Sequence, residues 1–516
     1  MFKNKLASPS QQKNVSIIGS GITGLVLGAM LSRKGYKVTI LESNPVFIGG
    51  HARSFSVEGI EFCAGPQFLW EFGKGDIGYR VLEFLNLESK ISMVPLNNKA
   101  QNYYQVGNDS GMLLPTGISG FKNKMLKKFP DEEEAIEDFF EYFDSLFQAS
   151  KHLEKEGLYM ADYSDMRSSI ALSGDVSFGA KLDVWKLAKK TLQETFDICE
   201  LSKEAQKYLY SSGGVFAEPA NELSIGVYVA AMGHIYTSAY VPRHGFKHMI
   251  NALVGVIKAG GGDVLTNNKV IKAVVSAGSI IKLETESGNT FSNEYVISTL
   301  SPRLTCKLIS QCDKDDFDYS PSNSLTSVFV GVKATKELLE KLKGRFNWWN
   351  AEGNNLDFAN PDMLKPPVHL YAGSQTALKS SNIAEGTVID LTIFAPGNFE
   401  QSRKTANRGK SIYNSFKERV IETVLKTTEQ YLIPGLRENI VFTEIKTPWD
   451  IYQDLGVEKG NVYGRRLNPD SVLSAVKTIN SVDNLTIANA SVGLPGIATC
   501  FNTANIFFEE LTGEKI

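Results

Sequence analysis

Residues 15–24 read VSIIGSGITG, and this stretch decides the fold of the amino-terminal part of the chain. The apolar residues 15–18 predict a short buried strand, and the glycine-rich turn after them opens a predicted helix over residues 25–34. A second run, KVTIL at residues 37–41, predicts another strand that finishes at Glu42. The sequence therefore predicts a complete β-α-β unit, the opening of a Rossmann-type α/β domain.

The glycine-rich turn has the spacing Gly-x-Gly-x-x-Gly, which binds dinucleotides when a strand precedes it and a helix follows. Gly19 permits the tight turn, Gly21 lets the backbone approach a pyrophosphate, and Gly24 allows the helix to pack closely on the strand. The first N–H groups of the helix favour a phosphate. We expect Glu42 to accept hydrogen bonds from the adenosine ribose hydroxyls. The alternative is a structural β-α-β unit without a ligand.

A second glycine-rich segment, GGHARSF at residues 49–55, follows the ribose-binding acid. Its glycines allow close approach of the backbone, and Arg53 is placed to neutralise a second phosphate. These features favour FAD over NAD as the cofactor.

These segments resemble those of the phytoene desaturase, carotenoid isomerase and retinol saturase flavoproteins, which are relatives of the amine oxidases. Residues 41–55 look like the second FAD motif of that family, and FCAGP at residues 62–66 looks like its Phe-Asp-Ala-Gly-Pro, with Cys63 in place of the acid. YVPRHGF at residues 240–246 and the segment 449–464 are also similar to family segments. The resemblance covers both ends and the middle of the chain, and it implies an FAD-dependent oxidoreductase.

The carboxyl-terminal segment departs from the family pattern. Residues 488–497 read ANASVGLPGI, where many relatives carry Gly-Ala or Gly-Asp and a longer glycine-rich loop. The turn at residues 493–496 still resembles the helix start beneath the flavin, and the resemblance places the backbone at Val270 against the adenine. The expected cofactor-binding residues are Gly19, Gly21, Ile22, Thr23, Gly24, Glu42, Ser43, Gly49, Gly50, His51, Arg53, Gly65, Pro66, Gln67, Val270, Asn489, Gly493, Pro495, Gly496 and Ile497.

The expected fold class is α/β, with a discontinuous Rossmann-like FAD-binding domain and a mixed α+β domain that binds substrate. The FAD-binding domain is expected over residues 1–75, 236–323 and 442–516, and the substrate-binding, partly helical domain over residues 76–235 and 324–441.

Hydrophobic periodicity predicts further elements along the chain. Helices are expected at residues 131–155, 182–210 and 246–259, and a further α/β layer with strands at 263–265, 269–275, 280–284 and 295–298 before a last strand at 484–488. The uncharged stretch 223–242 contains several polar side chains, which are costly in hydrocarbon, so it predicts a buried helix near a cavity and not a membrane span.

The sequence shows no Ser-His-Asp set, no metal-ligand spacing and no Walker loop, so no metal is expected. A flavin brings its own hydride or electron chemistry, and the protein orients the reactants and excludes water. His51 is the candidate acid or base, and a histidine that only hydrogen-bonds to backbone or cofactor is the alternative. Cys63 is expected to be a small buried residue, with a covalent flavin link as the alternative.

By resemblance, the substrate is a lipophilic polyene, and the reaction is desaturation, saturation or double-bond isomerisation. The cavity is expected to be lined by aromatic and apolar residues at 67–70, 215–216 and 223–240. Two alternatives remain open: a flavin amine oxidase acting on a small amine, and a non-catalytic lipid-binding protein similar to the GDI and Rab escort proteins.

A net charge of −3 over 516 residues provides no basic field, so nucleic acid is not an expected partner. The five cysteines are scattered and suggest neither a disulfide framework nor a zinc site. Residues 1–14 contain lysines but no apolar segment, so a secretory signal is not expected. These features indicate a cytoplasmic protein, and the lipophilic substrate leaves room for a peripheral membrane contact. The sequence indicates no oligomeric state and no electron acceptor.

Overall fold

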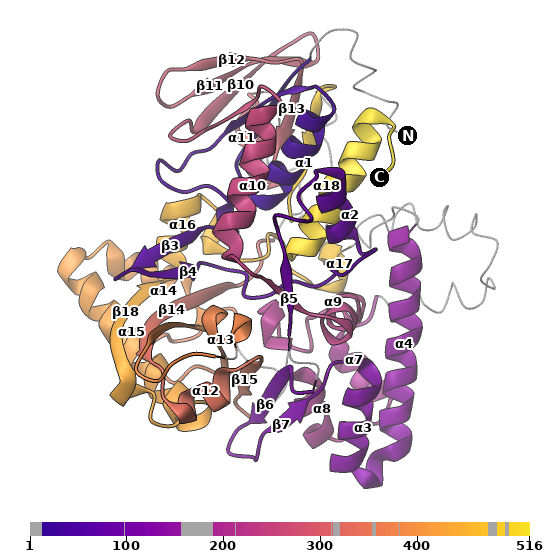
Figure 1. Cartoon of the computed structure of the whole chain (residues 1–516), viewed down its shortest axis with the longest axis vertical. Coiled ribbons are helices and arrows are strands. Elements are labelled where there is room, and N and C mark those ends of the chain that lie inside the picture. The colour runs from indigo at the N-terminus through magenta and orange to yellow at the C-terminus, as the bar shows by residue number, and fades with distance from the viewer. Residues whose placement is uncertain are drawn as a thin grey trace.

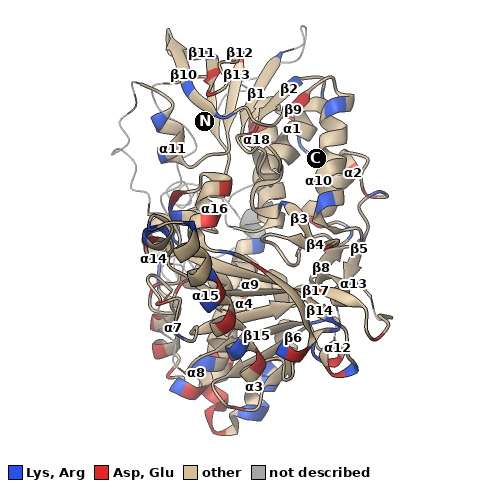
Figure 2. Cartoon of the chain, turned by 90° about the vertical axis from the view of Figure 1, so that its left-hand side faces the viewer, with Lys and Arg blue, Asp and Glu red and all other residues tan. Residues whose placement is uncertain are grey.

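The structure is a computed structural model that describes residues 13–96, 99–155, 189–211, 213–310, 312, 320–352, 358–380, 382–472, 482–490 and 495–516. Its elements gather around two main sheets, with the sheet that contains β1 in the upper part of Figure 2 and the sheet that contains β14 and β15 in the lower part.

The first sheet has five parallel strands in the order β19-β13-β1-β2-β9. Its strands are β1 (Asn14–Ile18), β2 (Lys37–Leu41), β9 (Asp263–Leu265), β13 (Tyr295–Ser298) and β19 (Leu485–Ile487). The predicted β-α-β opening is confirmed, and the β1 strand lies in the middle of this sheet. An all-parallel sheet needs cover on both faces, which explains why its strands are apolar runs.

Three long helices pack beside this sheet: α1 (Ile22–Arg33), α10 (Gly245–Ala259) and α18 (Ile497–Thr512). In the structure α1 contacts both of the others (Figure 1). Helix α1 begins three residues before its predicted start, because Gly21 serves as its N-cap and the rest of the glycine-rich turn is its first turn. The Rossmann-like α/β class is therefore confirmed.

Strands β10 (Val270–Ser276), β11 (Ser279–Thr285) and β12 (Thr290–Ser292) form a separate antiparallel sheet. The prediction that the strands near 269–284 belong to an α/β layer is therefore wrong. The reason is the turn between β10 and β11, where Ala277 and Gly278 both have positive φ angles, of 48° and 76°. Such a two-residue turn joins antiparallel strands.

The second sheet has seven strands in the order β18-β14-β17-β16-β15-β6-β7. Pairing is antiparallel except between β15 and β6, which are parallel. Its strands are β6 (Asn102–Val106), β7 (Met112–Leu114), β14 (Ser324–Lys333), β15 (Phe346–Asn350), β16 (His369–Gly373), β17 (Val388–Gly397) and β18 (Ile440–Lys446).

Side chains alternate between the two faces of this sheet. One face, with residues such as Val330 and Leu370, belongs to a core shared with α12 (Lys336–Leu342) and α15 (Lys410–Tyr431). The other face is aromatic, with Tyr104, Trp348 and Tyr371. It belongs to the core that includes α3 (Ile118–Lys128), α4 (Glu133–Lys155) and α9 (Ile225–Thr237).

Helix α9 confirms the buried helix predicted within 223–242, because all of its residues from Ile225 to Tyr236 are buried. The predicted helix over 182–210 is two helices in its described part, α7 (Leu192–Ile198) and α8 (Lys203–Tyr210), since Glu200 has a positive φ and Ser202 caps the second helix. Residues 182–188 lie outside the described residues. Within the part of the chain that the structure describes, no helix is both long and apolar enough to cross a bilayer.

The remaining elements are shorter connections between these layers. They are β3 (Ser54–Val57), β4 (Ile60–Cys63), α2 (Ile77–Phe84), β5 (Met93–Pro95), β8 (Tyr240–Pro242), α11 (Pro302–Lys307), α13 (Gln375–Lys379), α14 (Phe399–Ala406), α16 (Pro448–Leu455) and α17 (Pro469–Val472). On the side of the molecule seen in Figure 2, basic and acidic positions are intermingled along α8, α3, α14 and α15.

The scattered cysteines suggested no disulfide framework, and the structure joins one pair of them. Cys306 and Cys312 are joined, with their Cα atoms 5.4 Å apart. The sequence spacing did not reveal this pair, because it depends on how the chain turns after α11. Cys63, Cys199 and Cys500 are free thiols.

We predict that Gly24→Val destabilises the protein by about 1–3 kcal/mol, the usual cost of overpacking. A Cβ at this position would lie 2.8 Å from Thr299 Cγ2 and 2.9 Å from the Gly19 carbonyl oxygen. The measurement is the midpoint of urea unfolding of the apoprotein, followed by circular dichroism. Gly255→Val is the matched control, because Gly255 is also helical and its added Cβ would meet nothing within 4 Å. Equal midpoints for the two variants would contradict the prediction.

Candidate functional site

A cavity of about 380 Å³ extends between the two main sheets. On one side it is lined by the glycine-rich turn at residues 19–23, the end of β2 and residues 49–53. On the other side it is lined by residues of the aromatic face of the seven-stranded sheet, including Trp348 and Tyr371. The predicted cofactor motifs and the predicted apolar lining therefore meet in one cavity.

Most of the residues predicted to bind the cofactor line this cavity. They are Gly19, Gly21, Ile22, Thr23, Glu42, Ser43, Gly49, Gly50, His51, Arg53, Gly65, Pro66, Gln67, Asn489, Pro495, Gly496 and Ile497. Gly24 and Val270 are not part of the lining. Gly493 lies outside the described residues.

The glycine-rich turn is open to the cavity at the place where the sequence predicts a pyrophosphate. Gly19 has a φ of +92°, and a Cβ on it would lie 2.4 Å from Thr299 Oγ1. Gly21 differs, because a Cβ there would meet no atom within 4 Å. Since Gly21 also lines the cavity, its backbone is open to a ligand. Thr299, which lines the cavity at the end of β13, was not identified from the sequence.

Glu42 is buried and holds two turns together. Its Oε2 accepts hydrogen bonds from the Ser20 backbone N–H, at 2.9 Å, and from Ser20 Oγ, at 2.5 Å. Its Oε1 accepts from Ser43 Oγ at 3.1 Å and from the Asn44 backbone N–H at 2.7 Å. The carboxylate therefore shapes the phosphate turn directly, and its contact with a ribose hydroxyl remains a prediction.

Arg53 does not face the cavity as an isolated cation. Its Nη2 lies 2.9 Å from Asp454 Oδ2, and the same oxygen lies 3.1 Å from Lys446 Nζ. Arg53 and Lys446 both line the cavity, so these three side chains carry one net positive charge there. Such a cluster suits a phosphate. Lys446 and Asp454 were missed because β18 and α16 are remote in sequence from the glycine motifs.

Two helix N-termini open onto the cavity. Helix α1 has Gly21 as its N-cap and α18 has Gly496, and neither N-cap has a side chain to occupy the free N–H groups. Free N–H groups and the helix dipole both favour a negatively charged group. Gly496 has a φ of +129°, and a Cβ there would lie 2.5 Å from Trp70, so only glycine fits.

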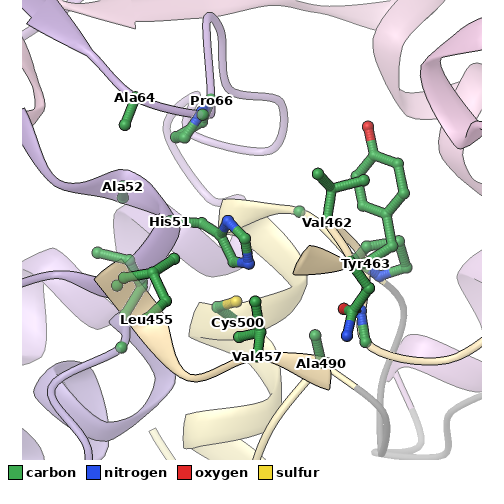
Figure 3. A pocket seen from close by; sticks show the side chains of 18 of the residues that line it. His51, Ala52, Ala64, Pro66, Leu455, Val457, Val462, Tyr463, Ala490 and Cys500 are labelled. Carbon is green, nitrogen blue, oxygen red and sulfur yellow. The ribbon is translucent and has the colours of Figure 1, made fainter. Parts of the chain in front are cut away.

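His51 lines the same cavity as Cys500, Val457 and Tyr463 (Figure 3). Burial, together with the charge of Arg53, lowers the pKa of His51 to about 4. The ring is therefore uncharged at neutral pH, and it is suited to accept or donate a hydrogen bond but is a weak proton acceptor. Its catalytic role remains a prediction.

The segment 455–464 was noted in the sequence for its resemblance only, without a role. The structure places Leu455, Val457, Asn461 and Tyr463 on the cavity wall. The expected aromatic and apolar lining is present in part. Phe68, Trp70, Val215, Phe216, Ala231 and Ile235 line the cavity, whereas Leu69 belongs to the core around the parallel sheet.

Neither cysteine near the motifs is an active thiolate. Cys63 does not line the cavity, its Sγ donates to the Ala52 carbonyl oxygen at 3.7 Å, and burial raises its pKa to about 12. Cys500 lines the cavity, and burial also raises its pKa. Among the described residues, no group of three or more His, Cys, Asp or Glu side chains is arranged to hold a metal ion.

Comparison with known proteins agrees with this geometry. A family model described as flavin containing amine oxidoreductase matches residues 22–403. The all-trans-retinol 13,14-reductase of Rattus norvegicus is 22% identical over 93% of this chain and 82% of its own length. The chloroplastic prolycopene isomerase of Daucus carota is 24% identical over 85% of this chain and 70% of its own length.

Solved structures share the fold at low sequence identity. A putrescine oxidase has a TM-score of 0.64 at 13% identity, covering 98% of this chain and 100% of its own. The cyclohexylamine oxidase of Brevibacterium oxydans has a TM-score of 0.58 at 13% identity, covering 97% of this chain and 100% of its own.

We predict that Gly21→Val abolishes FAD binding and leaves the apoprotein fold intact. The added side chain has room in the apoprotein, but it occupies the space that a pyrophosphate needs. FAD content of the purified variant and the thermal midpoint of its apoprotein measure the two effects. A variant that keeps its FAD would refute the placement of the phosphates at this turn.

We also predict that FAD is held without a covalent bond, since both nearby thiols stay protonated. Acid precipitation of the holoprotein should leave the yellow colour in the supernatant. Flavin absorbance that remains with the washed pellet would contradict this prediction.

Proposed function

The chain belongs to the flavin containing amine oxidoreductase family, and we propose that it is an FAD-dependent oxidoreductase acting on a lipophilic, unsaturated substrate of the carotenoid or retinoid kind. The reaction is desaturation, saturation or double-bond isomerisation of a polyene.

The observation that carries this proposal is the continuity of the cavity. The glycine-rich turn and the aromatic face of the seven-stranded sheet line the same space, so a substrate bound against Trp348 and Phe394 has access to a cofactor bound at the turn. An apolar chamber with few polar groups is suited to a polyene. The relatives support the same proposal, since the two named above are a retinol reductase and a prolycopene isomerase.

The chain contributes binding and orientation. A bound flavin supplies the hydride or electron chemistry. The N-terminus of α1 and the cluster of Arg53, Lys446 and Asp454 would hold its phosphates, and the N-terminus of α18 would lie at the flavin ring. The aromatic wall would keep water from the reacting atoms. The division into a discontinuous FAD-binding part and a substrate-binding part, with the boundaries expected from the sequence, belongs to this proposal.

A small amine is the second candidate substrate, because the solved structures that share the fold include two amine oxidases. A diamine would need an acidic side chain to pair with the ammonium group that lies away from the flavin. The described residues on the aromatic side of the cavity, from Phe68 to Ile235 and from Leu325 to Phe394, include no aspartate or glutamate among the cavity-lining side chains. This lack of acidic side chains favours a polyene over a diamine as the substrate.

The test is anaerobic mixing of holoenzyme with all-trans-retinol, prolycopene and phytoene, once with oxidised and once with reduced flavin, followed by visible absorbance and mass spectrometry. We expect one polyene to react. A product with two hydrogens fewer than its substrate, formed as the flavin bleaches, indicates a desaturase. A product with two hydrogens more, formed as reduced flavin is reoxidised, indicates a saturase. A product of unchanged mass with a shifted polyene spectrum indicates an isomerase. Bleaching by putrescine or cyclohexylamine, with no reaction of any polyene, would overturn the proposal.

A further inference from the structure

A single histidine interrupts the aromatic wall of the cavity. His369 is the first residue of β16, it lines the cavity, and only 2% of it is exposed. Its ring lies against the backbone of Gly214, where a Cβ would come within 2.1 Å of the ring. The rings of Trp348 and Phe358 lie beside it, with centroids 6.1 and 5.8 Å away. The imidazole is therefore held in a fixed orientation.

Asn350 determines which ring nitrogen of His369 carries the proton. The two residues face each other across β15 and β16, and His369 Nδ1 lies 2.5 Å from Asn350 Oδ1. The amide of Asn350 is oriented by its Nδ2, which donates to the Ser211 carbonyl oxygen at 3.4 Å. Its Oδ1 therefore faces the ring and accepts, so the Nδ1 of His369 is the donor.

The second ring nitrogen is then a hydrogen-bond acceptor. Burial lowers the pKa of His369 to about 3, so the ring is neutral at neutral pH and carries one proton. With that proton on Nδ1, the Nε2 atom has a free lone pair. Within the described ranges, Asn350 is the only side chain with a hydrogen bond to this ring, so the position of Nε2 is left without one.

Among the described residues, no hydrogen bond reaches this nitrogen. On the aromatic side of the cavity, His369 shares the lining with Trp348, Tyr371 and Phe394. Covering a hydrogen-bond acceptor without supplying a donor is unfavourable, so a ligand that brings a donor to Nε2 gains affinity over one that covers it unpaired.

We propose that His369 Nε2 accepts a hydrogen bond from a hydroxyl group of the substrate, so that the enzyme selects a polyene alcohol over a hydrocarbon polyene. Asn350 acts as the positioning residue that keeps Nε2 unprotonated. This inference rests on the proposed function, and it narrows the substrate class at the same cavity.

The first test uses the wild-type holoenzyme. Oxidised enzyme is titrated anaerobically with all-trans-retinol, with its methyl ether and with the corresponding hydrocarbon that lacks the oxygen, and binding is followed by the flavin spectrum and by tryptophan fluorescence. We expect retinol to bind about tenfold more tightly than either analogue, the ratio that one hydrogen bond of ordinary strength provides. The ether has an oxygen but no donor, so equal affinity of ether and alcohol would overturn the proposal.

Variants test the residues themselves. His369→Phe should remove the preference for retinol while changing the affinities for ether and hydrocarbon little. Asn350→Leu leaves the ring free to carry its proton on Nε2, so the ether should bind as well as the alcohol; a merely structural role of Asn350 would weaken all ligands alike. Phe394→Leu is the control, because it alters the same wall without a polar group and should weaken all three ligands by a similar factor.

Failure of this inference is distinguishable from failure of the proposed function. If the three ligands bind equally and a polyene is turned over, the hydroxyl anchor is wrong and the function stands. If no polyene binds while an amine bleaches the flavin, both are wrong. Because the ligand series uses the unaltered enzyme, a variant that does not fold leaves the test decisive.

Discussion

The close approach of three backbone segments at the end of the parallel sheet is the constraint on which the rest of the structure depends. The turn after β1 lies against Thr299 at the end of β13, and a Cβ at Gly19 or Gly24 would overlap that threonine. Glu42 closes the arrangement from β2, because its carboxylate accepts hydrogen bonds from both the backbone and the side chain of Ser20. The turn keeps its shape only where side chains are absent and this acid is present.

The two ends of the cavity have opposite chemical characters, and this contrast is the basis of the functional argument. At the parallel sheet the wall is built from free N–H groups, cations and a buried carboxylate, which suit a phosphorylated cofactor. At the antiparallel sheet it is built mainly from aromatic rings, with the buried imidazole of His369 among them. Neither sheet alone provides a site for redox chemistry on an apolar molecule, because cofactor and substrate walls come from different layers.

The sequence predicted the parts of this arrangement that are local. The glycine spacing predicted the turn that lines the cavity, with support from the strand before it and the acid after the next strand. The uncharged stretch around Tyr228 predicted the buried helix. The seven-stranded sheet could not be predicted in the same way, since β6 pairs in parallel with β15, a strand far along the chain. Thr299 and Lys446 reach the cavity, and Asp454 reaches Arg53, through contacts between segments that are equally distant in sequence, and no local pattern marks them. The same holds for the disulfide at Cys306, which depends on a turn of the backbone.

The order in which the chain is synthesised has a consequence for the cofactor site. Strand β1 is made first, yet its neighbour β13 comes from near residue 295 and the edge strand β19 from near residue 485. Asp454, whose carboxylate pairs with Arg53, also belongs to a late part of this sequence. So does the helix that begins after Gly496. On the side where β13 pairs, the first strand and its glycine turn therefore have no sheet partner until β13 has been translated. Flavin capture must then follow the synthesis of these late segments, and until then the incomplete chain is exposed to aggregation.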